Sequence, residues 1–162
     1  GAGYSNYLSG RRYKDVPKEA IIMPLIEDGE IFKKLTANNH KEGCTSSCYD
    51  CIRDYSNQGV HHLLDWRLGL DLARLAHDPK AQIDFSTEYW IDYINVTIKN
   101  VLLKHGYSVE SHEGALIGTD SYGEKYCLVH PLWSSQRIKK LTATLTGIYK
   151  PLSVFDVSKM ND

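Results

Sequence analysis

HKEGCTSSCYDC, residues 40–51, gathers three of the four cysteines of this chain and one histidine into the pattern H-x3-C-x3-C-x2-C. Thiolate and imidazole are the ligands that zinc prefers, and four of them close a tetrahedral structural site. Such a site replaces part of the core that a small module lacks, because metal binding and folding are then one event. The segment therefore predicts a zinc-stabilised module in which Cys44, Cys48 and Cys51 hold the ion.

The spacing leaves the fourth ligand open. His40 is the first choice because it lies nearest in sequence, and Cys127 is the second if the C-terminal hairpin folds back on the cluster. His61 or His62 is the third choice. The usual zinc signature has two tight C-x2-C knuckles, and here only one is present. His40 is accordingly the ligand that we predict.

Two other interpretations of the cysteines need no metal. Unpaired cysteines are among the most buried residues, so the thiols can simply be part of the core. Cys48 and Cys51 also have the spacing of a redox pair, but that role leaves Cys44 unused and lacks the βαβ context of thioredoxin-like proteins. The clustering of three thiols within eight residues favours the metal.

Length and charge limit what the chain can do alone. The 162 residues suit one domain or two small modules, are too few for an ATPase motor, and contain no Gly-x4-Gly-Lys-Ser/Thr loop. Nineteen Lys and Arg against twenty Asp and Glu give a net charge of -1, so long-range attraction cannot by itself bring the chain to DNA. Any contact with nucleic acid must use a local patch or a partner.

The compartment is predicted from what the sequence lacks. No run approaches the ~18 consecutive apolar residues that a membrane-spanning helix needs, so we expect no membrane. The residues Gly1-Ala2-Gly3-Tyr4 carry neither the charged nor the apolar region of a secretory signal. Clustered thiols also suit a reducing compartment. These features predict a cytoplasmic protein.

Apolar periodicity predicts three helices. The first starts near Asp28 and ends at Asn38–Asn39, residues that tolerate left-handed backbone. The second covers 60–77, ends at Asp78-Pro79, and buries one face made of Leu63, Leu64, Leu68, Leu72, Leu75 and Ala76. The third covers 86–106 and buries a stripe made of Trp90, Ile94, Ile98, Val101 and Leu102.

Strand-like runs follow the third helix. Residues 107–117 and 126–133 are predicted to pair as a hairpin across the turn-rich loop 118–123, and the alternating run 152–157 to form a last strand. The pattern of 134–149 does not decide between helix and strand. The predicted fold class is α+β, with a zinc-stabilised helical module at 1–80 and a small α/β module at 81–162.

The order of elements in the second module is similar to a nuclease-type α/β core. In such cores an Asp on one strand and a Glu-x-Lys on the next hold a metal. Asp120 fits the first position, but the second strand, Lys125 to His130, has no acidic residue and lysine at the required spacing. A core of this type would therefore be degenerate and catalytically inactive. His130, inside an apolar run, is expected to be a core or turn histidine.

Basic residues follow the cysteines and continue along the predicted leucine helix. Arg53, Arg67 and Arg74 are candidates for contacts with nucleic-acid phosphate, with the metal knuckle fixing their direction. The alternative is that Asp65, Arg67, Asp71 and Arg74 form the solvated, ion-paired face of an amphipathic helix. The sequence favours neither interpretation.

Two neighbouring runs, CYDCIRDYSN at 48–57 and HHLLDWRLGLDL at 61–72, resemble a known family. They are similar to the C-terminal, MrfA-type zinc-binding domain of DEAD/DEAH-box superfamily 2 helicases, whose relatives include helicase-associated proteins of phage-defence systems such as DISARM and Druantia. GAGY at 1–4, VHPLW at 129–133 and VFD at 154–156 resemble other parts of the same helicase proteins. The resemblance is strongest around the cysteines.

The resemblance implies a zinc site that serves a DNA-processing helicase, with Cys44, Cys48 and Cys51 as matching ligands. Many members use four nearby cysteines, and the cluster here has three, which adds weight to His40. The chain is then expected to be a C-terminal piece of a longer protein or one half of a split protein. We expect a non-catalytic accessory role in DNA repair or phage defence.

The expected partners are DNA and the superfamily 2 motor domains, in the same or a separate chain, where ATP is hydrolysed. Two alternatives belong to other classes of function. The chain could be a nuclease-like enzyme that uses its C-terminal module, or a structural adaptor that holds proteins together through its zinc knuckle.

Overall fold

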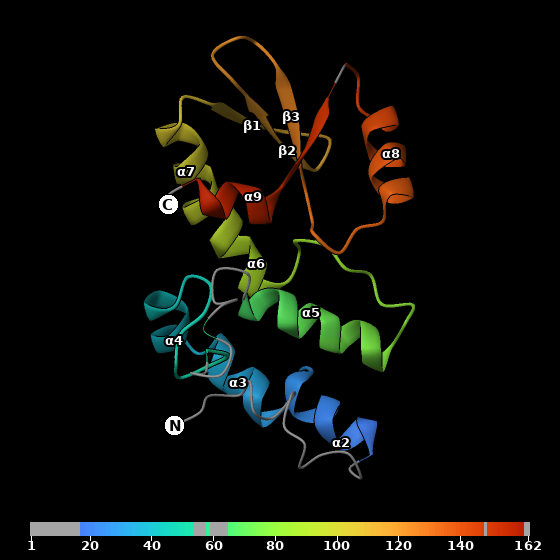
Figure 1. Cartoon of the computed structure of the whole chain (residues 1–162). Coiled ribbons are helices and arrows are strands. Elements are labelled where there is room, and N and C mark those ends of the chain that lie inside the picture. Colours follow the sequence, from blue (N-terminus) through green and yellow to red (C-terminus); the bar gives the residue numbers. More distant parts are fainter. Residues whose placement is uncertain (1–16, 54–57, 59–64, 148, 161–162) are drawn as a thin grey trace. The chain divides into compact units, whose positions relative to one another are not determined.

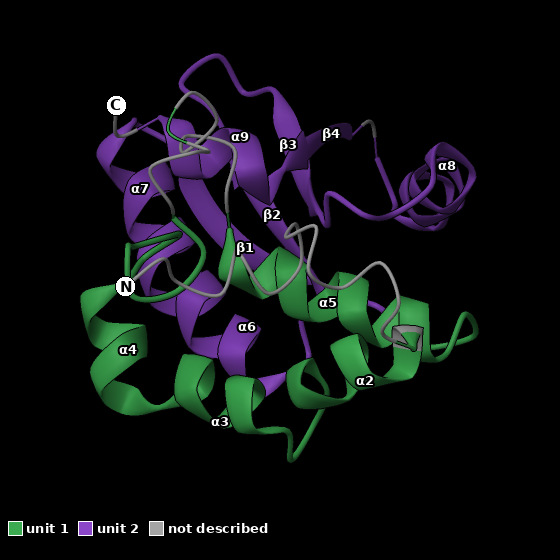
Figure 2. Cartoon of the chain, turned by 60° about the horizontal axis from the view of Figure 1, so that its bottom comes forward, with its two compact units in different colours: residues 1–82 green, residues 83–162 purple. Residues whose placement is uncertain are grey.

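The structure, a computed structural model, describes residues 17–53, 58, 65–147 and 149–160. The chain divides into two compact units, unit 1 at Gly1–Gln82 and unit 2 at Ile83–Asp162 (Figure 2). This division lies near the predicted module boundary at residues 80 and 81. The α+β class is confirmed, because the described part of the chain contains helices and a four-stranded sheet.

The described part of unit 1 is built from short helices. They are α2 (Lys18–Ile22), the 3-10 helix η2 (Met23–Leu25), α3 (Glu30–Thr36), α4 (Asn38–Gly43) and α5 (Trp66–His77). Gly29 precedes α3, and no larger residue fits there, because a Cβ would lie 2.3 Å from the carbonyl oxygen of Pro24. The predicted helix after Asp28 is confirmed as α3, with Ile31 and Leu35 buried.

The predicted end of this helix at Asn38–Asn39 is wrong. The chain turns one residue earlier, at Ala37, whose backbone is extended with φ -60° and ψ 143°. The carbonyl of Ala37 accepts hydrogen bonds from the backbone N–H groups of His40 and Lys41, at 3.0 and 2.9 Å. Asn38 therefore begins α4 instead of ending α3, and this second short helix carries His40 toward the cysteines.

Helix α5 begins at a strong N-cap but buries a different face from the predicted one. The side chain of Asp65 accepts hydrogen bonds from the backbone N–H groups of Arg67 and Leu68, and residues 60–64 of the predicted helix lie outside the described residues. Trp66, Leu70 and Ala73 form the buried face, and α5 packs against α2 and η2. Trp66 is fully buried, so the side of α5 that carries its ring faces the interior of unit 1.

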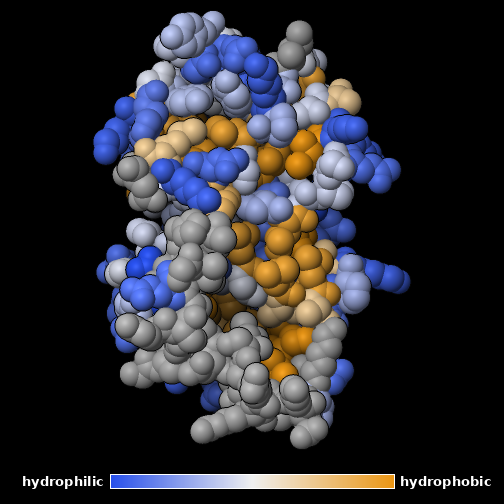
Figure 3. Space-filling view, viewed as in Figure 1, coloured by the Kyte–Doolittle hydropathy of each residue, from blue (hydrophilic) through white to orange (hydrophobic). Residues whose placement is uncertain are grey.

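The predicted leucine face is consequently turned partly to the surface. Leu72 is 53% exposed and Ala76 is also exposed, while Leu68 and Leu75 are half-buried. Figure 3 shows apolar side chains gathered on the surface over α5. Periodicity correctly predicts an amphipathic helix here but not its buried side. Most of the leucines lie on the stripe next to the one that contains the buried Trp66.

Unit 2 starts with the predicted long helix, which is confirmed. It consists of α6 (Glu88–Asp92), the π-helical segment η4 (Tyr93–Ile98) and α7 (Lys99–Lys104), which follow one another without a break. The five residues of the predicted stripe are buried. Gly106 ends the helix with φ 83°, a left-handed conformation that glycine adopts without strain.

The sheet of unit 2 has the order β1-β2-β3-β4. Its strands are β1 (Ser108–His112), β2 (Ala115–Thr119), β3 (Lys125–Val129) and β4 (Lys150–Ser153). The first three strands are antiparallel, and β4 runs parallel to β3 after the crossover helix α8 (Ser135–Thr144). Helix α8 lies beside β4, whereas α7 and α9 (Val154–Lys159) pack against each other away from α8 (Figure 1).

Two strand predictions need correction. The run 107–117 is not one strand but a hairpin, because Glu113 and Gly114 form a two-residue turn with φ 49° and 80°. Two positive φ values define the type I′ turn that matches the twist of paired strands. The predicted last strand 152–157 ends at Ser153, whose hydroxyl accepts the backbone N–H of Phe155 and so begins α9.

The core under the sheet joins the strands to α8. Ile117 of β2 and Cys127 of β3 are fully buried and pack with Leu145, and Leu141 of α8 lies against this cluster. The residues 134–149, which the sequence left undecided, thus contain a helix that is amphipathic enough to cover the sheet. This arrangement leaves the opposite face of α8 to the solvent.

We predict that Gly114→Ala destabilises unit 2 by about 1–2 kcal/mol, the cost of a left-handed conformation for a residue with a Cβ. No atom lies within 4 Å of the added carbon, so the effect is conformational. The matched control is Gly69→Ala in α5, where space is also open and φ is helical. This second variant should be stabilised by roughly 0.5–1 kcal/mol. Thermal unfolding measures both, and equal shifts would contradict the turn assignment.

Candidate metal centre

The structure brings together the four residues of the predicted ligand set. One ligand atom from each of His40, Cys44, Cys48 and Cys51 lies within 4.8 Å of the others. The Sγ atom of Cys51 is 3.8 Å from that of Cys44 and 3.5 Å from that of Cys48, and the Sγ of Cys48 is 3.7 Å from Nε2 of His40. Zn–S bonds of about 2.3 Å in a tetrahedron place sulfurs about 3.8 Å apart. The geometry therefore fits a four-coordinate ion.

The imidazole of His40 is held in the tautomer that a metal requires. Its Nδ1 lies 2.8 Å from the carbonyl oxygen of Leu35. A carbonyl can only accept, so Nδ1 carries the proton and donates this bond. The lone pair of the neutral ring is then on Nε2, which is the atom that faces the cysteines. A fixed second nitrogen of this kind is typical of histidine ligands.

The cysteines are placed by a helix end and a tight turn. The backbone N–H of Cys44 donates to the carbonyl of His40 at the end of α4. The carbonyl of Cys48 accepts from the backbone N–H groups of Cys51 and Arg53, at 3.2 and 2.9 Å. This turn folds the C-x2-C pair so that both sulfurs point to one place, and the N–H of Cys48 donates to the Sγ of Cys51 at 3.1 Å.

These contacts favour the thiolate form of Cys51. The hydrogen bond from the Cys44 thiol lowers the pKa of Cys51, the backbone N–H of Cys48 lowers it further, and burial opposes both effects. The pKa of Cys44 is raised, first by its hydrogen bond to Cys51 and then by burial. The contacts within the cluster thus favour one thiolate, that of Cys51, and a thiolate is the form that binds a metal.

The loop that carries the ligands is attached to the start of α5 through three successive carbonyl groups. The carbonyl of Cys44 accepts from Nε1 of Trp66 at 3.1 Å, and that of Ser46 accepts from the backbone N–H of Trp66 at 2.9 Å. Between them, the carbonyl of Thr45 accepts from the guanidinium of Arg67. The ring of Trp66 also meets the imidazole of His40 edge-on, with centroids 5.3 Å apart.

Arg67 has an internal role, so its predicted contact with phosphate is wrong. It is only 4% exposed, and its guanidinium lies 4.3 Å over the ring of Trp66. The alternative of a solvated face is also wrong for Arg67 and Asp71, because Asp71 is fully buried as well. Asp65 is half-buried. Arg53 and Arg74 are half-buried, and they donate to the hydroxyl of Ser47 and the carbonyl of Gln82.

The other candidate ligands do not join the cluster in the described residues. Cys127 lies in the core of unit 2, and its burial raises the pKa of its thiol to about 11. His61 and His62 lie outside the described residues. His130 is 1% exposed and packs among the rings of Phe85, Trp90 and Trp133, which confirms the prediction of a core histidine.

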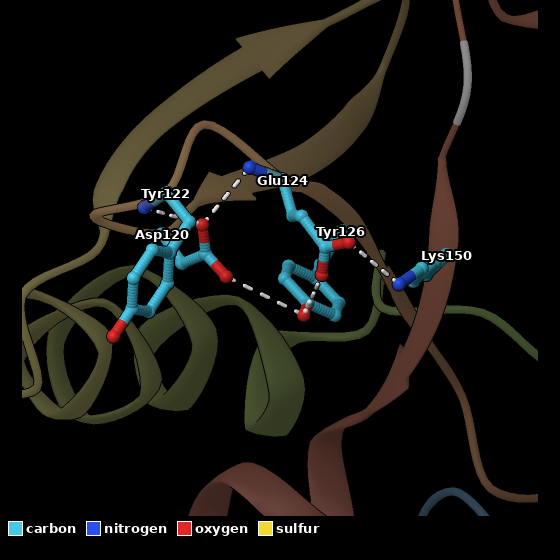
Figure 4. Close-up of polar contacts among 5 residues, drawn as sticks. All are labelled: Asp120, Tyr122, Glu124, Tyr126 and Lys150. Carbon is cyan, nitrogen blue, oxygen red and sulfur yellow. Dashed lines mark hydrogen bonds and ion pairs between the residues drawn. The ribbon is translucent and has the colours of Figure 1, made fainter.

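Asp120 serves to organise the loop between β2 and β3. One carboxylate oxygen of Asp120 accepts from the backbone N–H groups of Tyr122 and Glu124, each at 2.9 Å (Figure 4). Glu124 accepts from the hydroxyl of Tyr126 at 2.9 Å and pairs with Lys150 at 2.8 Å, and no motif in the sequence marks it. These bonds tie the loop to the start of β4, and no metal group of three ligands forms there among the described residues.

Comparisons with family models, with curated proteins and with solved structures give no match to this chain. The resemblance of residues 48–57 and 61–72 to helicase zinc domains therefore stays a prediction from the sequence. In the described part of the chain, no helix has the length and apolar character needed to cross a bilayer.

We predict that Asp65→Asn stabilises the protein in a pH-dependent way. Burial raises the pKa of Asp65 from 3.8 to about 6, although the charge of Arg67 opposes this shift. The favourable contribution of a protonated Asp65 is present below pH 3.8 and is lost as the pH rises through 6. Asparagine keeps the N-cap acceptor without the charge.

The measurement is the difference in Tm between Asp65→Asn and the wild type from pH 4 to pH 8. We expect this difference to grow with pH and to reach the equivalent of about 1–3 kcal/mol. Loss of metal at low pH lowers the Tm of both proteins, so its effect cancels in the difference. A difference that stays constant with pH would contradict the prediction.

Proposed function

We propose that this chain is a non-catalytic, zinc-binding accessory region of a superfamily 2 DNA helicase. The observation that carries the proposal is the convergence of three sulfurs and one imidazole nitrogen within 4.8 Å. Soft thiolate ligands with one imidazole suit zinc, and four protein ligands leave no coordination position for a substrate. The metal would therefore be structural.

A structural ion suits the small core of unit 1. Its described helices other than α5 are seven residues or shorter, and isolated helices of this length are not stable in water. His40 on α4 and the three cysteines would be bound to one ion. The carbonyls of the same loop reach Trp66 and Arg67, so the ion would stabilise α5 as well.

Engagement of DNA or of the motor domains is the second part of the proposal. It rests on the resemblance of residues 48–57 and 61–72 to helicase zinc domains. Of the predicted arginines, Arg53 and Arg74 remain candidates for phosphate contacts. Arg53 follows the Cys48–Cys51 turn directly and is held by Ser47, so the metal knuckle would fix its position.

We predict one zinc ion per chain in protein prepared without added metal, measured by elemental analysis. Cys51→Ser should lose the ion and unfold unit 1, because structural zinc contributes on the order of 10 kcal/mol to such modules. His40→Ala should bind zinc more weakly. Cys127→Ser is the matched control, since it removes an equally buried thiol in unit 2 and should keep the full zinc content. Folded wild type without zinc would overturn the proposal.

We also predict that the zinc-loaded chain has no ATPase activity and binds DNA weakly, with affinity that falls steeply as salt rises. Fluorescence anisotropy with labelled duplex DNA of several sequences measures this. Arg53→Gln with Arg74→Gln should reduce binding equally for every sequence, whereas Arg67→Gln should act only through stability. Tight binding to one defined sequence would contradict an accessory role.

A further inference from the structure

Positive charge is concentrated in one part of unit 2. Residues 125–155 contain five Lys and Arg and no Asp or Glu, in a chain whose net charge is -1. Three of the five, Arg137, Lys139 and Lys140, lie on helix α8. A local patch of this kind can attract a polyanion even when the net charge of the whole chain cannot.

Helix α8 presents these three residues to the solvent. Leu141 packs on the core of the sheet and Ile138 is half-buried, so the apolar side of α8 faces inward. Arg137, Lys139 and Lys140 are all exposed, as are Gln136 and Ala143. The solvent face of this helix therefore carries three positive charges, no negative charge and no large apolar side chain.

The guanidinium of Arg137 is positioned by an aromatic ring. It lies 4.4 Å over the ring of Trp133. That ring is itself fixed, because Nε1 of Trp133 donates to the carbonyl of Ile83 at 2.6 Å. Stacking uses the face of a guanidinium and leaves its N–H edge for hydrogen bonds, which is the geometry that recognises phosphate.

No carboxylate neutralises this face within the described residues. The ion pair between Lys150 and Glu124 does not include α8, and no carboxylate pairs with Arg137, Lys139 or Lys140 in this part of the chain. Arg137 and Lys140 are three residues apart, so they are neighbours on the helix surface, about 5–6 Å between Cβ atoms.

We propose that the exposed face of α8, formed by Arg137, Lys139 and Lys140, binds the phosphate backbone of nucleic acid. A membrane surface is a poorer match, because helices that lie in a bilayer interface need large apolar side chains beside their basic ones. The inference goes beyond the proposed function, since this surface lies in unit 2 and requires no metal. Contacts of this kind position nucleic acid without reading its sequence.

The test compares the wild-type chain with Lys139→Gln/Lys140→Gln by fluorescence anisotropy on a labelled duplex DNA across a range of salt concentrations. Each phosphate contact contributes about -0.9 to the slope of log affinity against log salt. The double variant should therefore make this negative slope shallower by about two. The control is Lys99→Gln/Lys104→Gln on α7, which removes two exposed lysines from the same unit. Its slope should equal that of the wild type.

Two further arms separate this inference from the proposed function. Arg53→Gln/Arg74→Gln tests unit 1, and vesicles with anionic headgroups test a lipid source of phosphate. If binding responds to the arginine variant and not to the α8 variant, the inference is overturned while the proposed function stands. Binding of the wild type to vesicles but not to DNA, or equal losses in the α8 and α7 variants, would also overturn it. Zinc content should be unchanged in the α8 variant, whatever the outcome for DNA.

Discussion

The hydrogen bonds from Trp66 and Arg67 to the carbonyls of Cys44, Thr45 and Ser46 are the constraint on which the described part of unit 1 depends. They join two segments that lie about twenty residues apart and place the ligand loop against the start of α5. A buried carbonyl without a partner costs stability, so a loop with three successive carbonyls turned inward needs three donors. Trp66 supplies two of them and Arg67 the third. The same hydrogen bonds therefore fix both the position of the ligand loop and the side of α5 that faces it.

This dependence explains what could be predicted about the site. The ligand set of His40, Cys44, Cys48 and Cys51 is local, because a short helix and a tight turn bring residues at spacings of three and four to one point. The spacing of these residues in the sequence is therefore enough to predict the ligand set. The donors on Trp66 and Arg67 are not local, and no periodic pattern marks them. The abundance of leucine predicted a buried stripe next to the one that contains Trp66. Arg67, a charged residue at the start of a helix, was expected at the surface but is buried.

In unit 2 the prediction succeeded where one face of an element alone is buried. The helical segment from Glu88 to Lys104 has one buried stripe and polar residues elsewhere, so its period is clear. The run 152–157 is too short to be decided in this way. Val154 and Val157 are both buried and lie three residues apart, which suits a helix, yet the same letters alternate like a strand. The hydroxyl of Ser153 settles the choice by capping α9.

Two arginines show why charge in a sequence has to be read together with burial. Arg67 and Arg137 stack on tryptophan rings at nearly the same distance, 4.3 and 4.4 Å. Arg67 is buried and directs its guanidinium to a backbone carbonyl, so its charge stabilises the interior. Arg137 is exposed, and its neighbours on α8 add charge of the same sign. Like charges side by side on a helix destabilise it slightly unless a counter-charge is present. An anionic partner on α8 would remove that cost, whereas the arginine beside the metal centre already has its partner within unit 1.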